Sequence, residues 1–165
     1  MTDWFKNDAL FFAQLKAGYD WQLLPAIFFR CCGLLVEMPK LTVRDNVADA
    51  PAWTDSDTDL VVNGKVIEVK SRGERFTHPN DFPYDEPFVD TVSGYDAKNP
   101  KPVAYVFVSQ ITGCMVCVSS SSSKRFRVLA KHDRVRDIDE RFYVCDRSML
   151  RTMNKLVVHL KLVRE

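Results

Sequence analysis

Residues 59–70 read DLVVNGKVIEVK and predict a β-hairpin near the middle of this 165-residue chain. Asn63 and Gly64 separate two apolar runs, and this dipeptide favours a two-residue turn because both of its positions require a positive φ. Side chains alternate along a strand, so we expect Glu68 and Lys70 to share one face of the second strand. Asp59 stands at the start of the first strand. The hairpin is therefore predicted to bring two carboxylates and a lysine together.

This trio has a chemical use. Carboxylate oxygens are the ligands that a hard divalent cation prefers, and a lysine beside them adds a positive charge. A bound metal ion and a nearby ammonium group both favour negative charge on a phosphate, which suits phosphodiester cleavage. A solvated strand edge can carry the same Glu-x-Lys letters. The tight turn, the leading Asp59 and the apolar flanks favour a functional site.

At these residues the chain resembles the PD-(D/E)xK nuclease superfamily, whose core holds an acidic residue on one strand and (D/E)-x-K on the next. The matching residues are Asp59, Glu68 and Lys70, while Thr58 stands where the superfamily usually has proline. The resemblance implies an α/β fold with a central mixed β-sheet flanked by helices, that is, a restriction-endonuclease-like core. It also implies a metal-dependent nuclease that hydrolyses phosphodiester bonds in DNA.

The superfamily places a helix before the hairpin, often with a glutamate facing the site. Residues 20–33 predict such a helix, with Asp20 as a possible N-cap and Gly33 as its end. Gln22 occupies the position that corresponds to the glutamate. A glutamine can orient a water molecule or bind a metal weakly, so Gln22 joins the candidate catalytic residues.

The resemblance also implies how the site divides its work. Asp59 and Glu68 would bind Mg²⁺, with Mn²⁺ as a possible substitute, and the carbonyl of Val69 would be a third ligand. Lys70 would orient the attacking water or stabilise the charge that develops on the phosphate. Gln22 is a candidate for positioning that water.

Four further residues are candidates for substrate contact. Residues 71–87 look irregular, and a loop of this length in a small domain is usually functional or mobile. Arg72 and Arg75 in this loop would either meet phosphate or serve as ordinary surface arginines. A short helix is predicted over about 88–98, from which Tyr95 and Lys98 would flank the site, although a core role suits Tyr95 better.

The rest of the chain predicts a single domain with a core over about 20–118 and a C-terminal extension over about 119–165. The apolar pattern predicts a first helix at about 3–17 that Gly18 breaks and a strand at about 34–43. A polar loop at about 44–56 leads to the hairpin. Beyond it we expect buried strands at about 103–108 and 114–118, a serine-rich loop at 119–123, mixed strand and loop to about 145, and a final helix capped by Asp146 or Ser148.

The cysteines favour a structural role. Cys114 and Cys117 lie three apart in a strand-like run, so their side chains face opposite sides and do not easily bind one ion. We therefore expect buried free thiols in a reducing compartment. A zinc site that adds His132 and Cys145 is the alternative.

Charge is unevenly distributed along the chain. Residues 1–60 hold 5 basic and 9 acidic residues, whereas residues 121–165 hold 12 and 6. A basic region beside metal-binding carboxylates fits a nucleic-acid partner, with DNA expected ahead of RNA, and a solvated surface of paired charges is the alternative. The resemblance also allows a homodimer.

Asp3 and Asp8 do not fit a signal peptide, and no run reaches the roughly 18 apolar residues of a membrane span, so we expect a cytoplasmic protein with no membrane partner.

Two other classes of function stay open. The first is a non-catalytic nucleic-acid-binding or assembly protein that retains the nuclease fold, and Gln22 in place of glutamate favours it. The second is an interaction protein in which the hairpin is only a scaffold. In that case Glu68→Ala and Lys70→Ala would leave every activity unchanged.

Overall fold

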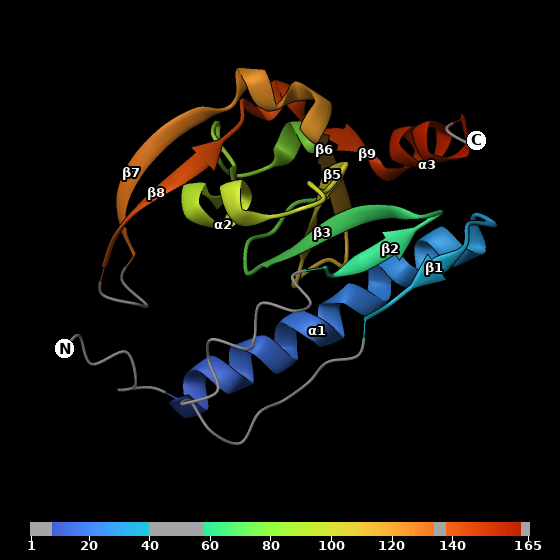
Figure 1. Ribbon diagram of the computed structural model, residues 1–165, viewed down its shortest axis with the longest axis horizontal. Coiled ribbons are helices and arrows are strands. Elements are labelled where there is room, and N and C mark those ends of the chain that lie inside the picture. The colour runs from blue at the N-terminus through green and yellow to red at the C-terminus, as the bar shows by residue number, and fades with distance from the viewer. Residues whose placement is uncertain (1–7, 40–57, 134–137, 163–165) are drawn as a thin grey trace.

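The computed structural model describes residues 8–39, 58–133 and 138–162 and has an α/β architecture (Figure 1). Its elements in chain order are α1 (Asp8–Cys31), β1 (Val36–Glu37), β2 (Leu60–Val62), β3 (Lys65–Arg72), the short 3₁₀ helix η2 (Pro79–Asp81), β4 (Phe88–Thr91), α2 (Val92–Ala97), β5 (Ala104–Ser109), β6 (Met115–Ser119), η3 (Ser120–Arg125), β7 (Arg127–Asp133), β8 (Ile138–Val144), η4 (Arg147–Met149), β9 (Arg151–Thr152) and α3 (Met153–Leu162).

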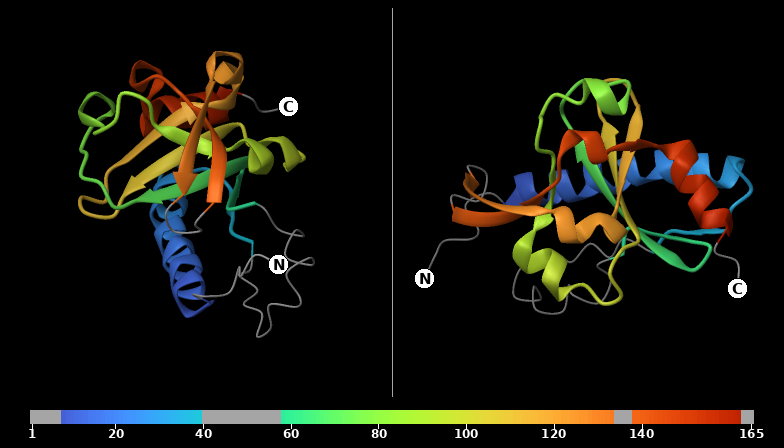
Figure 2. Two further views of the ribbon diagram at one scale, coloured as in Figure 1. Left: turned by 90° about the vertical axis from the view of Figure 1, so that its left-hand side faces the viewer. Right: turned by 90° about the horizontal axis from the view of Figure 1, so that it is seen from above.

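The strands form two sheets. The larger has the order β1-β2-β3-β5-β6-β9, and only its β3–β5 pair is parallel. This confirms the predicted mixed sheet. The smaller sheet has the order β4-β8-β7, and its β7 and β8 form a long curved ribbon beside α2 (Figures 1 and 2).

The predicted hairpin is confirmed. Val62 pairs with Lys65 across the turn, and both turn residues have positive φ, 48° at Asn63 and 73° at Gly64. The Asn63 side chain also accepts a hydrogen bond from the backbone N–H of Leu35 at 2.9 Å. The turn is thus tied to Leu35, the residue directly before β1, as well as closed by its own geometry.

Alternation along β3 divides its residues between two cores. Ile67 and Val69 face α1 and α3, where they join one buried apolar cluster with residues such as Phe29 and Leu156. Across β5, Tyr105 and Phe107 belong to a second cluster on the opposite face, which the smaller sheet covers. Because side chains alternate, Glu68 and Lys70 lie on this second face.

Two predicted boundaries are wrong. Gly18 does not break the first helix, since α1 runs continuously through it and through Pro25. A glycine in a helix costs only about 1 kcal/mol, which the burial of residues such as Ala26 and Phe29 further along α1 can offset. The predicted helix over 88–98 is β4 followed by the shorter α2, because residues 88–91 pair with β8.

Other expectations have mixed outcomes. The serine-rich loop is largely the helix η3, and the predicted strand at 34–43 appears as the short β1. Residues 3–7, 40–43 and the polar loop at 44–56 lie outside the described residues. The C-terminal region contributes to the main sheet through β9 and to the core through α3.

Cys114, Cys117 and Cys145 are free thiols, and burial raises the pKa of Cys117 and of Cys145 to about 12.

Candidate functional site

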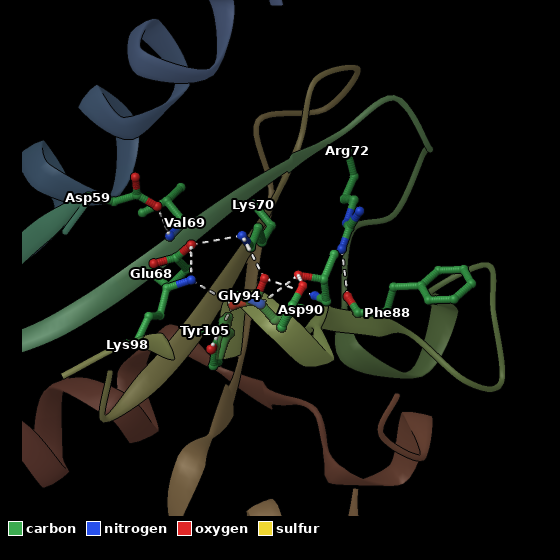
Figure 3. A network of polar contacts seen from close by, with 12 residues as sticks. Asp59, Glu68, Val69, Lys70, Arg72, Phe88, Asp90, Gly94, Lys98 and Tyr105 are labelled. Carbon is green, nitrogen blue, oxygen red and sulfur yellow. Dashed lines mark hydrogen bonds and ion pairs between the residues drawn. The ribbon is translucent and has the colours of Figure 1, made fainter. Parts of the chain in front are cut away.

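Asp59 links helix α1 to the hairpin at the start of β2. Its Oδ1 accepts a hydrogen bond from Gln22 Nε2 at 2.7 Å, and its Oδ2 accepts one from the backbone N–H of Val69 at 2.7 Å. The structure therefore brings together Gln22, Asp59 and Val69, three residues that the sequence places in one site. The contact between Asp59 and Val69 is visible in Figure 3.

The backbone of β3 presents an open edge at Val69. The pairing of β2 with β3 ends at Ile67, and the next outward N–H, that of Val69, bonds the Asp59 carboxylate instead. The N–H and C=O of one strand residue point to the same side. The carbonyl of Val69 therefore faces the edge where Asp59 lies.

Glu68 and Lys70 lie in a cluster of alternating charges (Figure 3). Lys70 Nζ lies 2.7 Å from Glu68 Oε1 and 3.4 Å from Asp90 Oδ1. Lys98 Nζ lies 2.8 Å from Asp90 Oδ2 and 3.5 Å from Glu68 Oε1. Glu68 and Asp90 are both buried, and each contacts both lysines. Such pairing offsets the cost of burying a charge.

Sequence reasoning missed Asp90 and Tyr105. Tyr105 donates a hydrogen bond from its hydroxyl to Asp90 Oδ2 at 3.0 Å, and the same carboxylate holds both lysines. The only signal for Asp90 is one acidic residue within the apolar, β-branched run FVDTV at 88–92. Tyr105 lies in a strand that the sequence predicts as fully buried, where a hydroxyl requires a partner.

The pKa values reflect this crowding of charge. Burial, followed by repulsion from Glu68, raises the pKa of Asp59 from 3.8 to about 7. Burial lowers the pKa of Lys70, but the nearby Glu68 and Asp90 outweigh it, and the net pKa lies above its ordinary value. Burial also raises the pKa of the Tyr105 hydroxyl, with a further contribution from Asp90.

The site carries more negative than positive charge when its groups are ionised. Its three carboxylates are Asp59, Glu68 and Asp90, and its two ammonium groups belong to Lys70 and Lys98. The formal sum is −1, and protonation of Asp59 brings it to zero. A cation bound at Asp59 would relieve this excess and favour the ionised carboxylate.

The donor set fits a divalent cation that keeps much of its water. Glu68 Oε2 is buried and accepts no hydrogen bond from the described residues, so one carboxylate oxygen is left without a partner. Within the described ranges, no three or more His, Cys, Asp or Glu side chains are grouped to hold a metal. Two carboxylates are nevertheless a usual protein contribution to Mg²⁺, which retains several waters. Asp59 and Glu68, with the Val69 carbonyl, are the residues that would supply such a set.

The four candidates for substrate contact differ in position. Lys98 is part of the charge cluster, and the Tyr95 ring stacks beside Tyr105 with centroids 6.3 Å apart. Arg75 is exposed on the loop after β3. The Arg72 guanidinium donates to the carbonyl of Phe88 and lies 5.3 Å from the centre of the Phe107 ring, and burial lowers its pKa. Arg72 thus has a packing role that the sequence did not indicate.

Comparisons with known proteins identify no relative: no family model, no curated protein and no solved structure matches this chain. Among the described residues, none of the helices is long and apolar enough to cross a bilayer. The functional argument therefore rests on the residues of the site and on their arrangement.

Proposed function

We propose that this protein is a Mg²⁺-dependent nuclease that hydrolyses phosphodiester bonds in DNA, on a restriction-endonuclease-like core. The observation that carries the proposal is that Asp59, Glu68 and Lys70 interact electrostatically at the hairpin, while Glu68 Oε2 is buried and has no hydrogen-bond partner among the residues that the structure describes. An excess of negative charge in a buried cluster is expected where a cation belongs.

In this proposal Asp59 and Glu68 hold Mg²⁺, and the Val69 carbonyl completes the protein's share of the ligands. When bound, the ion supplies Lewis-acid stabilisation to a phosphate oxygen and lowers the pKa of a coordinated water. Lys70 stabilises the charge that builds on the phosphate, because its ammonium group is held in place and kept protonated by its carboxylate neighbours. Gln22, which is hydrogen-bonded to Asp59, would orient a water beside it.

A nucleic-acid partner is supported by the distribution of basic residues. The 36 residues from 97 to 132 hold six basic side chains and no acidic one. Among them, Lys124 and Arg125 are exposed at the end of η3, and Lys131 is exposed on β7. Phosphate contacts by such side chains supply most of the sequence-independent affinity for nucleic acid.

One observation favours the second candidate, a non-catalytic nucleic-acid-binding protein on the same fold. Gln22 donates to Asp59, and Lys70 and Lys98 both contact Glu68 Oε1. Apart from Glu68 Oε2, the site is therefore largely satisfied by the protein's own donors. On this account the protein binds DNA equally well with a chelator present and cuts none.

Cleavage assays distinguish the two candidates. Plasmid, linear and single-stranded DNA and RNA would be incubated with the protein in Mg²⁺, Mn²⁺ or EDTA. We expect metal-dependent cutting that Glu68→Gln and Lys70→Ala each abolish. Asp96→Asn, on exposed α2, and Lys65→Ala, at the far end of β3, are matched controls that should cut as the wild type does. No cutting of any substrate by the wild type would refute the nuclease proposal.

A further inference from the structure

A β-bulge directs Asp90 into the site. Phe88 pairs with Val144 and Asp90 with Tyr143, so Val89 is one extra residue on β4. Regular alternation would point Val89 and Asp90 in opposite directions, yet both are buried. Bulges are common beside active sites because they redirect a side chain. Here the bulge places the Asp90 carboxylate in contact with both Lys70 and Lys98.

We propose that Asp90 is a positioning residue that holds Lys70 and Lys98 apart and fixed beside Glu68; its effect on catalysis rests on the proposed nuclease function. Asp90 accepts from four donors, which is enough to hold a buried carboxylate in a single orientation. Oδ1 receives Lys70 Nζ at 3.4 Å and the N–H of Thr91 at 3.0 Å. Oδ2 receives Lys98 Nζ at 2.8 Å and the Tyr105 hydroxyl at 3.0 Å.

The distances show how Asp90 divides the two lysines. Lys98 lies closer to Asp90, at 2.8 Å, than to Glu68, at 3.5 Å, whereas Lys70 lies closer to Glu68. Without Asp90, the ion pair with Glu68 would be the one that remains for both ammonium groups among the contacts of the described residues. They would then neutralise the carboxylate that the proposal assigns to the metal. Asp90 therefore preserves the capacity of Glu68 to bind a cation.

The first turn of α2 packs closely against Thr91 and Asp90. Thr91 Oγ1 accepts the N–H of Gly94 at 2.9 Å, which caps the helix directly after Asp90. A Cβ at Gly94 would lie 2.7 Å from Thr91 Oγ1 and 3.4 Å from Asp90 Oδ1. A Cβ there would force the Thr91 hydroxyl to move, whereas 3.4 Å to Asp90 Oδ1 is an ordinary van der Waals contact. Figure 3 shows Gly94 beside Asp90. Because the N–H of Thr91 donates to Asp90 Oδ1, Gly94→Ala disturbs Asp90 through Thr91 while every charge is retained.

The test compares Asp90→Asn and Gly94→Ala with the exposed control Asp96→Asn. The first readout is the side-chain ammonium NMR signal of each lysine, because ion-paired, buried ammonium groups exchange slowly with water. We expect observable signals for Lys70 and Lys98 in the wild type and the control. In Asp90→Asn the Lys98 signal should be lost and the Lys70 signal displaced. Gly94→Ala should displace both.

The second readout separates catalysis from binding. Asp90→Asn should lower kcat roughly 100-fold with KM nearly unchanged, since a catalytic group misplaced by about 1 Å costs that much. Gly94→Ala, which keeps the charge, should lower kcat less. A protein damaged only in its folding would lose active molecules without losing one ammonium signal selectively, and thermal melts would reveal it. If Asp90→Asn does not fold, Gly94→Ala decides the question on the same readouts.

Unchanged ammonium signals in the folded variants would overturn the positioning role, whatever their activity. If the ammonium signals are lost but kcat is unchanged in an enzyme that cuts DNA, the proposed effect of Asp90 on catalysis is also overturned. If the wild type cuts no substrate, the nuclease proposal fails by itself, and the NMR comparison still decides whether Asp90 fixes the two lysines.

Discussion

Removing the charge of Asp59 should make the metal-free protein more stable. Burial and the neighbouring Glu68 raise the pKa of this carboxyl to about 7, so its ionised form is unfavourable in the folded state. The amide introduced by Asp59→Asn would have no charge and nearly the same shape. The oxygen of the new amide can take the place of the Asp59 oxygen that accepts from the Val69 N–H. Gln22 can turn its own amide to accept from the new NH₂ group. Few contacts are lost, while the electrostatic cost disappears.

The size and the pH dependence of the gain follow from linkage. A rise in pKa from 3.8 to about 7 corresponds to about 4 kcal/mol of unfolding free energy. The unfolded state loses this proton near pH 4 and the folded state only near pH 7, so wild-type stability falls through that interval and the penalty is constant above it. Allowing for partial solvation of the carboxyl, we expect Asp59→Asn to gain roughly 2 to 4 kcal/mol above pH 7, and almost nothing at pH 3 to 4.

Thermal and urea unfolding in a chelator at pH 4, 6 and 8 would measure this gain. For a chain of this length, about 3 kcal/mol raises Tm by roughly 6 to 12 °C. The exposed Asp96→Asn is the control and should change stability by less than about 0.5 kcal/mol at each pH. A loss of stability at pH 8 in Asp59→Asn, or an equal gain at pH 4 and pH 8, would refute the reasoning.

Three further predictions concern the surroundings of the site. Gln22→Glu places a carboxylate against Asp59, so it should lower metal-free stability by about 1 to 3 kcal/mol in urea unfolding and tighten Mn²⁺ binding about tenfold; unchanged affinity would place Gln22 outside the metal site. Arg72→Lys should lower the unfolding free energy by about 1 to 2 kcal/mol, because lysine cannot reproduce the flat contact with the Phe107 ring; an unchanged urea midpoint would leave Arg72 free for phosphate. Lys124→Ala with Arg125→Ala should reduce the salt slope of DNA binding by about 1.8, measured in EDTA, and an unchanged slope would move the nucleic acid away from η3.

The sequence predicts the local parts of the site well. The turn dipeptide and period-two alternation are short-range signals, so the hairpin and the shared face of Glu68 and Lys70 follow from adjacent residues. The placement of Asp59 beside Val69 follows from the hairpin register. Gln22 depends on a longer contact, and the resemblance to a known pattern indicates it where periodicity alone does not.

The missed features depend on tertiary structure. Asp90 enters the site because β4 pairs with β8, more than 50 residues later in the chain, and bulges there. No residue pattern within 88–98 indicates the pairing with β8 or the bulge, so the helical spacing of the apolar residues predicts a helix instead. Gly18 predicts a helix end, although packing further along α1 outweighs its weak propensity. These errors arise where distant contacts override local preference.

The central claim is that Asp59 and Glu68 form a divalent-cation site, and calorimetric titration of the metal-free protein with Mn²⁺ at pH 8 tests it directly. The account predicts one ion per chain and binding at least about tenfold weaker in Asp59→Asn and in Glu68→Gln, since each loses a charged ligand. Asp96→Asn should bind as the wild type does. Absence of binding to the wild type, or wild-type affinity in the two site variants, would contradict the account.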